Sequence, residues 1–167
     1  MDIYLVRHGV AEPRGAEIDD APRRLTEDGI ARLRRVADGL SRLGVEVDAV
    51  LSSPYPRAWE TAELLSDELG WPAPAELVAL APGGSAAECL AALSARAEAA
   101  LAVVGHEPNL SELASLLLAG AESLLRIDLR KAGVVCLSGP PGLSPGSCVL
   151  RWSASPRMLR RLARPRL

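Results

Sequence analysis

The sequence lacks the features that mark disulfide-linked, zinc-binding and membrane-spanning proteins. Its three cysteines are widely spaced and none belongs to a C-x-x-C pair, so neither a disulfide framework nor a zinc site is predicted. No apolar run approaches the roughly 20 residues that cross a bilayer, and a strand begins at the N-terminus without a secretory signal before it. A net charge of −2 gives no indication of nucleic-acid or membrane binding. We therefore expect a cytoplasmic protein with reduced thiols.

Length and composition predict one globular domain. The chain has 167 residues, of which 49% are hydrophobic and 24% are charged, proportions that are typical of a folded protein rather than a disordered one. No internal repeat or shift in composition divides the sequence. We expect a single domain over residues 1–167, and a monomer.

Apolar stretches alternate with helical patterns along most of the chain. Strands are expected over 2–7, 48–52, 101–105, 132–138 and 147–152, and helices over about 26–44, 55–69, 86–100 and 109–118. Pro72 and Pro74 indicate a turn, and Asn109 with Glu112 is typical of a capping box. Strands separated by helices predict an α/β fold, a three-layer α/β/α sandwich with a mainly parallel sheet and an antiparallel edge formed by the last strands.

Basic and imidazole side chains follow three of the predicted strands. Arg7 and His8 end the first strand, Arg57 comes one turn after the second, and His106 follows the strand over 101–105. Both histidines of the chain are thus placed at the carboxyl ends of strands, where open α/β sheets bind ligands. Two guanidinium forks and two imidazoles suit a tetrahedral oxyanion such as phosphate. Each residue alone could be an ordinary loop or surface group, but together they predict a phosphate site.

Three motifs carry a resemblance to a known family. RHG at 7–9, LSSPYPRAWETA at 51–62 and VVGHEPNL at 103–110, in this order, resemble the histidine phosphatase superfamily, whose fold is phosphoglycerate mutase-like. The short length and RRLTEDG at 23–29 resemble its small branch, the SixA-type phosphohistidine phosphatases. The resemblance covers the chain from Asp2 to about Trp152. It implies that His8 is the nucleophile, that Arg7, Arg57 and His106 hold the phosphoryl group, and that no metal or cofactor is needed.

The residue that protonates the leaving group is left open by the sequence. Glu107 directly follows His106, where one large branch of the superfamily places its acid, although SixA-like members are not reliably acidic there. Glu107 could instead interact with the dipole of the helix that begins near Asn109. Glu12, Asp19 and Asp20 are the competing carboxylates. Ser52 and Ser53 could orient Arg57 or the phosphate, or act as turn and cap residues.

The expected substrate is a phosphorylated protein that carries phosphohistidine, or a small phosphate ester. A compact chain without an obvious lid indicates an open pocket, which suits either substrate. A mutase-type transfer fits poorly, because such enzymes are longer and carry an insertion that closes over the site. A phosphate-binding module without turnover is the non-enzymatic alternative, and the intact His8 argues against it.

Two groups of basic residues receive no catalytic role. Lys131, the only lysine, is expected at a solvent-exposed strand edge. The C-terminal arginines predict a short amphipathic helix with a solvent-facing side, or a docking surface for an acidic partner. They are Arg157, Arg160, Arg161, Arg164 and Arg166.

Overall fold

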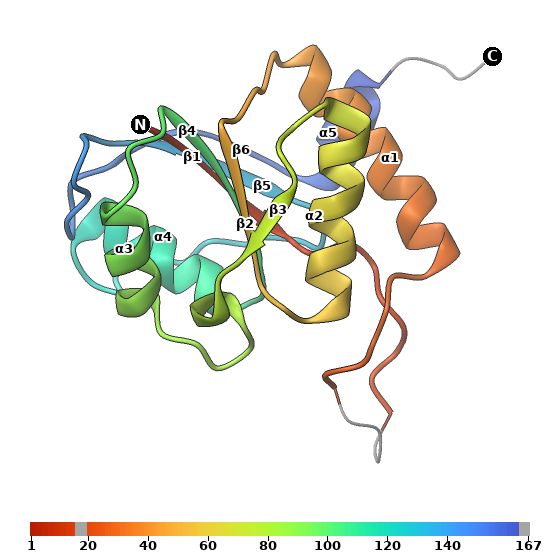
Figure 1. Ribbon diagram of the computed structural model, residues 1–167, viewed down its shortest axis with the longest axis horizontal. Coiled ribbons are helices and arrows are strands. Elements are labelled where there is room, and N and C mark those ends of the chain that lie inside the picture. Colours follow the sequence, from red (N-terminus) through yellow and green to blue (C-terminus); the bar gives the residue numbers. More distant parts are fainter. Residues whose placement is uncertain (16–19, 164–167) are drawn as a thin grey trace.

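The computed structural model describes residues 1–15 and 20–163, which contain a six-stranded sheet. Its arrangement is shown in Figure 1. The strands lie in the order β3-β2-β4-β1-β5-β6. β4 pairs in parallel with β1 and β2, and β2 in parallel with β3, while β5 and β6 are antiparallel additions at the β1 side. Their bounds are Asp2–Arg7 (β1), Ala49–Ser52 (β2), Pro74–Glu76 (β3), Ala100–Gly105 (β4), Val134–Ser138 (β5) and Val149–Ala154 (β6). The predicted parallel sheet with an antiparallel edge is confirmed.

Helices cover both faces of this sheet, which confirms the three-layer prediction (Figure 1). α1, α2 and α5 pack on one face, and α3 and α4 pack on the other. Side chains alternate along β1 and divide the core in two. Tyr4 and Val6 face α1, α2 and α5, whereas Ile3 and Leu5 face α3 and α4. The helices are Glu27–Arg42 (α1), Pro56–Leu69 (α2), Ala86–Ser94 (α3), Asn109–Ala119 (α4) and Pro156–Leu162 (α5).

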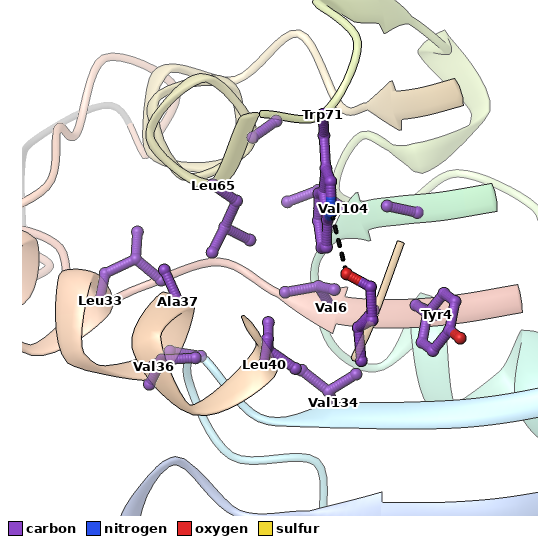
Figure 2. Packing of buried hydrophobic residues seen from close by; sticks show 14 of the residues in the cluster. Tyr4, Val6, Leu33, Val36, Ala37, Leu40, Leu65, Trp71, Val104 and Val134 are labelled. Carbon is purple, nitrogen blue, oxygen red and sulfur yellow. Dashed lines mark hydrogen bonds between the residues drawn. The ribbon is translucent and has the colours of Figure 1, made fainter. Parts of the chain in front are cut away.

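A continuous apolar core lies between the sheet and the helices α1, α2 and α5. Leu33 and Leu40 of α1 and Leu65 of α2 are fully buried against the sheet (Figure 2). Trp71 lies in the same cluster and donates its indole N–H to the carbonyl oxygen of Val45 at 3.2 Å, which satisfies its one polar atom (Figure 2). The core therefore fixes α2, whose first turn carries Arg57, against the end of β2.

The start of α1 is held close to the segment that follows β1. Thr26 is the N-cap and its hydroxyl accepts the Gly29 amide at 3.0 Å, as expected for this residue type. Thr26 also donates its backbone N–H to the Val10 carbonyl at 3.0 Å. A Cβ on Gly29 would lie only 2.1 Å from that carbonyl oxygen, so glycine permits the close approach.

Three local predictions are wrong. The expected turn after residue 71 contains β3, an edge strand that begins at Pro74, where a missing N–H leaves no ladder bond broken. The helix expected over 86–100 ends at Ser94, because the chain must turn back before β4 pairs with β1. Asn109 does not form a capping box, since its buried amide donates to the Ala79 carbonyl at 3.0 Å and Pro108 is the N-cap.

The C-terminal helix agrees with its prediction in the residues described. α5 begins at the N-cap Ser155 and buries Leu159, whose carbonyl oxygen would lie 2.2 Å from a Cβ on Gly39 of α1. Arg157 and Arg161 are exposed. Arg164 and Arg166 lie outside the described residues. No helix within residues 1–15 and 20–163 is long and apolar enough to cross a membrane.

Candidate active site

The carboxyl ends of β1, β2 and β4 meet at one edge of the sheet, because these neighbouring strands are parallel. Arg7 at the end of β1 lies opposite Gly105 of β4, and Ser52 of β2 lies opposite Val104. A pocket of about 430 Å³ opens at this edge. All five residues that the sequence suggested for the site line it: Arg7, His8, Arg57, His106 and Glu107.

His8 is buried and its ring is held by one nitrogen. Nδ1 lies 2.8 Å from the carbonyl oxygen of Gly9, so the tautomer with the proton on Nδ1 leaves the Nε2 lone pair free. Burial, with the positive charges of Arg57 and Arg7, lowers the pKa of His8 to about 3, although the Gly9 carbonyl acts in the opposite direction. The ring is therefore neutral at pH 7, the state in which Nε2 can act as a nucleophile.

Both arginines are held at their terminal nitrogens. Arg7 donates from Nη1 to the carbonyl oxygen of Leu129 at 2.9 Å. Arg57 donates from Nη1 to the backbone oxygen of Asp20 at 2.8 Å and from Nη2 to a carboxylate oxygen of Asp20 at 2.6 Å. The Nε atom of each guanidinium is buried and has no hydrogen-bond partner in the described part of the chain.

The ring of His106 is also held by one nitrogen, in this case by a serine. Its Nε2 lies 2.8 Å from Oγ of Ser53, and the Ser53 oxygen also accepts the Tyr55 amide at 3.2 Å. Burial, followed by the charges of His8 and Arg57, lowers the pKa of His106 to about 3, so this ring is also neutral at pH 7. The two imidazoles lie 5.0 Å apart, measured between ring centroids. Ser53 therefore contacts His106, rather than orienting Arg57 as one sequence alternative suggested.

Three buried side-chain nitrogens lack a partner within the described residues, and all belong to residues of this pocket. They are Nε of Arg7, Nε of Arg57 and Nδ1 of His106. A buried polar atom without a hydrogen bond costs about 1–3 kcal/mol, so such atoms are rare in folded proteins. Their occurrence together indicates a ligand that accepts several hydrogen bonds at once.

Glu107 faces the pocket but is also bonded to the helix that follows it. Its two carboxylate oxygens accept the Ser111 amide at 3.2 Å and the Ser111 hydroxyl at 2.5 Å. Burial raises the pKa of Glu107 above its ordinary value, against the opposing effect of Ser111 and Arg7. The side chain is thus able to hold a proton at a higher pH than an exposed glutamate.

The other candidate acids are engaged differently. Asp20 binds Arg57 and, through its other oxygen, Nη1 of Arg23 at 2.6 Å. Burial alone would raise the pKa of Asp20, but the hydrogen bonds and charges of the two arginines outweigh it and lower that pKa. Glu12 accepts the Arg24 amide at 3.0 Å. Asp19 lies outside the described residues.

Lys131 is a pocket residue that the sequence reasoning missed. It is half-buried on the pocket wall, and burial, with the charges of Arg7, Arg23 and Arg57, lowers its pKa. The expectation of an exposed edge is wrong because β5, which follows Lys131, lies inside the sheet beside β1. The next residue, Ala132, has φ +60° and donates its amide to the carbonyls of Arg7 and His8 at 3.0 Å each. Only the antiparallel pairing of β5 with β1 could have indicated this position.

The described residues contain no group of three or more His, Cys, Asp or Glu side chains that could hold a metal ion. The pocket is instead rich in cationic side chains. Beyond Arg7 and Arg57, its wall includes Arg14, Arg23 and Lys131. Such a lining favours an anionic ligand over a cation.

Comparison with known proteins gives consistent matches over most of the chain. The model of the histidine phosphatase superfamily (branch 1) matches residues 3–80. An uncharacterised protein of Picosynechococcus sp. is 40% identical over 141 residues, which cover 82% of this chain and 84% of that protein. Phosphohistidine phosphatase SixA of Escherichia coli (strain K12) is 34% identical over 124 residues, covering 72% of this chain and 76% of the relative.

A solved structure extends this likeness to the fold. The protein histidine phosphatase SixA complexed with tungstate superposes with a TM-score of 0.82 at 28% identity, covering 94% of this chain and 98% of that one. The predicted phosphoglycerate mutase-like fold is confirmed by this match.

Proposed function

Because this chain belongs to the SixA-type branch of the histidine phosphatase superfamily, and is therefore a phosphatase, we propose that it acts through a phosphorylated His8 and removes phosphate from phosphohistidine in a protein. The main support is the set of three buried nitrogens without partners, on Arg7, Arg57 and His106. A phosphoryl group offers three non-bridging oxygens, which accept hydrogen bonds from such donors.

Binding leaves the phosphorus in front of His8. Nε–H groups of Arg7 and Arg57 and Nδ1–H of His106 donate to the phosphoryl oxygens. The Ser53 oxygen already accepts the Tyr55 amide and its hydroxyl proton is available to Nε2 of His106, which supports the tautomer with the proton on Nδ1. Both imidazoles are neutral at pH 7, so one can attack and the other can donate.

The first chemical step forms the bond between His8 Nε2 and phosphorus while the bond to the leaving group breaks. Charge spreads over the non-bridging oxygens in the transition state, and the fixed cations stabilise it there. The Nδ1–H bond to the Gly9 carbonyl stabilises the positive charge that develops on the ring. The leaving imidazole or alkoxide takes a proton from an acid, for which Glu107, with its raised pKa, is the best supported candidate.

The second step is hydrolysis. Water attacks the phosphorus of phospho-His8, the bond to Nε2 breaks, and the carboxylate of Glu107 accepts the proton that water loses. Asp20 suits this proton transfer poorly, because two arginines hold it in the ionised form.

The chemistry and the substrate are tested together by a substrate panel and a trapping experiment. The panel compares p-nitrophenyl phosphate, a phosphohistidine-bearing protein and sugar phosphates, and we expect the highest kcat/KM with phosphohistidine. A quench during turnover of a labelled substrate should give an acid-labile, base-stable phosphoryl group. His8→Ala should lose both this label and the activity.

Two results would contradict the proposal. Label that remains in His8→Ala would move the nucleophile to another residue. Phosphate binding without turnover of any substrate in the panel would favour a binding module, and a preference for sugar phosphates would favour the small-molecule phosphomonoesterase.

A further inference from the structure

We propose that Asp20 is a positioning residue, which holds the Arg57 guanidinium in its phosphate-binding orientation, and that Arg23 holds Asp20 in place. This inference rests on the proposed function, because it assigns Arg57 to the phosphoryl group. It concerns how one of the phosphate-binding side chains is oriented before phosphate binds.

The contacts between Asp20 and Arg57 occupy only one edge of the guanidinium. Asp20 accepts from Nη1 with its backbone oxygen and from Nη2 with a carboxylate oxygen. A guanidinium has five N–H donors in a rigid plane, so the edge formed by Nε and the second hydrogen of Nη2 is left over. Nε is the buried atom without a partner. This second edge can bind two phosphoryl oxygens while Asp20 keeps the first.

The buried environment of Arg57 requires a hydrogen-bond acceptor with a negative charge. The Arg57 side chain is only 4% exposed, and a buried guanidinium is costly without an opposite charge or acceptors. Arg7 and His8 are held by backbone carbonyls of Leu129 and Gly9, and His106 by a serine hydroxyl. Among the contacts of the described residues, Arg57 alone of these four is held by a carboxylate. Asp20 therefore supplies both the acceptors and the negative charge before phosphate arrives.

Asp20 itself is fixed by a second arginine, independently of phosphate. Arg23 donates from Nη1 to the remaining carboxylate oxygen of Asp20 at 2.6 Å and from Nε to the backbone oxygen of Glu12 at 2.7 Å. The Arg23 side chain is 11% exposed. Glu12 lies in the segment between β1 and α1, next to an isolated antiparallel bridge, and its amide donates to the Arg24 carbonyl at 2.9 Å.

That bridge, which pairs Ala11 with Leu25, is hydrogen-bonded to α2, the helix that also carries Arg57. The Leu25 amide donates to the carboxylate of Glu60 on α2 at 2.8 Å, and Arg24 pairs with the same carboxylate. Arg57 is part of α2, and Asp20 is connected to the same helix through this chain of hydrogen bonds. We infer that these connections fix the guanidinium plane relative to His8.

The opposite interpretation is that Asp20 competes with phosphate for Arg57. Competition requires both ligands to use the same edge of the guanidinium, and the contacts of Asp20 leave the Nε edge open. The two interpretations predict opposite effects when Asp20 is removed. Positioning predicts weaker oxyanion binding, and competition predicts tighter binding.

The test measures tungstate and orthophosphate binding by calorimetry, together with kcat and KM for p-nitrophenyl phosphate. We expect Asp20→Ala to weaken oxyanion binding and to lower kcat/KM about 10²-fold, the usual effect of a misplaced catalytic group. Asp20→Asn keeps an acceptor oxygen but loses the charge, so its loss should be intermediate. Asn is also the conservative variant that serves if the alanine variant does not fold.

A double-mutant cycle identifies the route of the effect. In an Arg57→Ala background, Asp20→Ala should change oxyanion affinity and kcat/KM by no more than about twofold each, because Arg57, the residue through which Asp20 acts, is gone. Asp28→Ala is the matched control, since it removes an exposed carboxylate whose partner, Arg32, lies on the same helix outside the pocket. The control should behave as wild type.

Three outcomes separate this inference from the proposed function. Unchanged or tighter oxyanion binding by Asp20→Ala refutes positioning, as does an equal loss in the presence and absence of Arg57. A wild-type protein that binds neither tungstate nor phosphate refutes the proposed phosphate site itself.

Discussion

Removal of the Ser53 hydroxyl should weaken catalysis through His106, whose tautomer it holds. Ser53 and His106 are 0% and 3% exposed, so no solvent replaces the lost partner of Nε2. The His106 ring of the variant can then adopt one of two tautomers. Either Nε2 is left as an unsatisfied buried acceptor, or the proton moves to Nε2 and Nδ1 can no longer donate to the phosphoryl group.

The magnitude follows from the cost of such an atom. An unsatisfied buried polar group costs about 1–3 kcal/mol, which corresponds to about 5- to 150-fold in kcat/KM at 1.36 kcal/mol per tenfold. We expect Ser53→Ala to lose kcat/KM for p-nitrophenyl phosphate within this range, and to bind tungstate more weakly by a similar factor.

The neighbouring serine provides a matched control. Ser52 is also 0% exposed, and its hydroxyl donates to the backbone oxygen of Ser53 at 3.0 Å, whereas Nε2 of His106 is hydrogen-bonded to Ser53. Ser52→Ala removes the same type of atom from the neighbouring residue at the end of β2. It should lower the free energy of unfolding and leave kcat/KM nearly unchanged. Equal losses of kcat/KM in the two variants would refute the role given to Ser53.

Two further predictions concern protons. The pKa values of about 3 for folded His8 and His106 lie below the ordinary 6.5, so between these pH values the unfolded chain binds protons that the folded chain does not. The free energy of unfolding should therefore fall as pH drops from 6.5 towards 3. Urea denaturation at pH 7 and pH 5 measures this, and an unchanged free energy would contradict the neutral, buried histidines. Glu107→Gln should lower kcat/KM, which reports phosphoryl transfer to His8, about 10²–10⁴-fold more for alkyl phosphates than for p-nitrophenyl phosphate, whose leaving group needs little protonation. The kcat/KM for phosphohistidine should change little, and equal losses of kcat/KM with all three substrates would contradict the role of Glu107 as the acid.

The sequence determined the layer architecture and the edge of the sheet at which the pocket lies. Strand and helix periods are local properties, and the carboxyl ends of neighbouring parallel strands coincide by geometry. The position of Arg7 at the end of a strand, and those of His8 and His106 directly after strands, therefore indicated that these side chains lie at the same edge of the sheet. Arg57 followed for the same reason, since it is in the first turn after β2. The structure brings all four to one pocket.

Only the tertiary structure decided what holds these groups and what else surrounds them. Asp20 contacts Arg57 across 37 residues of sequence, and Ser53 contacts His106 across 53. Hydrogen bonds between such distant residues leave no periodic pattern, so Asp20 appeared in the sequence only as one acid among several. Lys131 enters the pocket because β5 pairs antiparallel with β1, which starts β5 beside the end of β1. Asn109 was misread as a cap because its partner, the Ala79 carbonyl, lies 30 residues away. Periodicity records which residues share a face, whereas the partner of a buried polar atom is set by how distant segments pack.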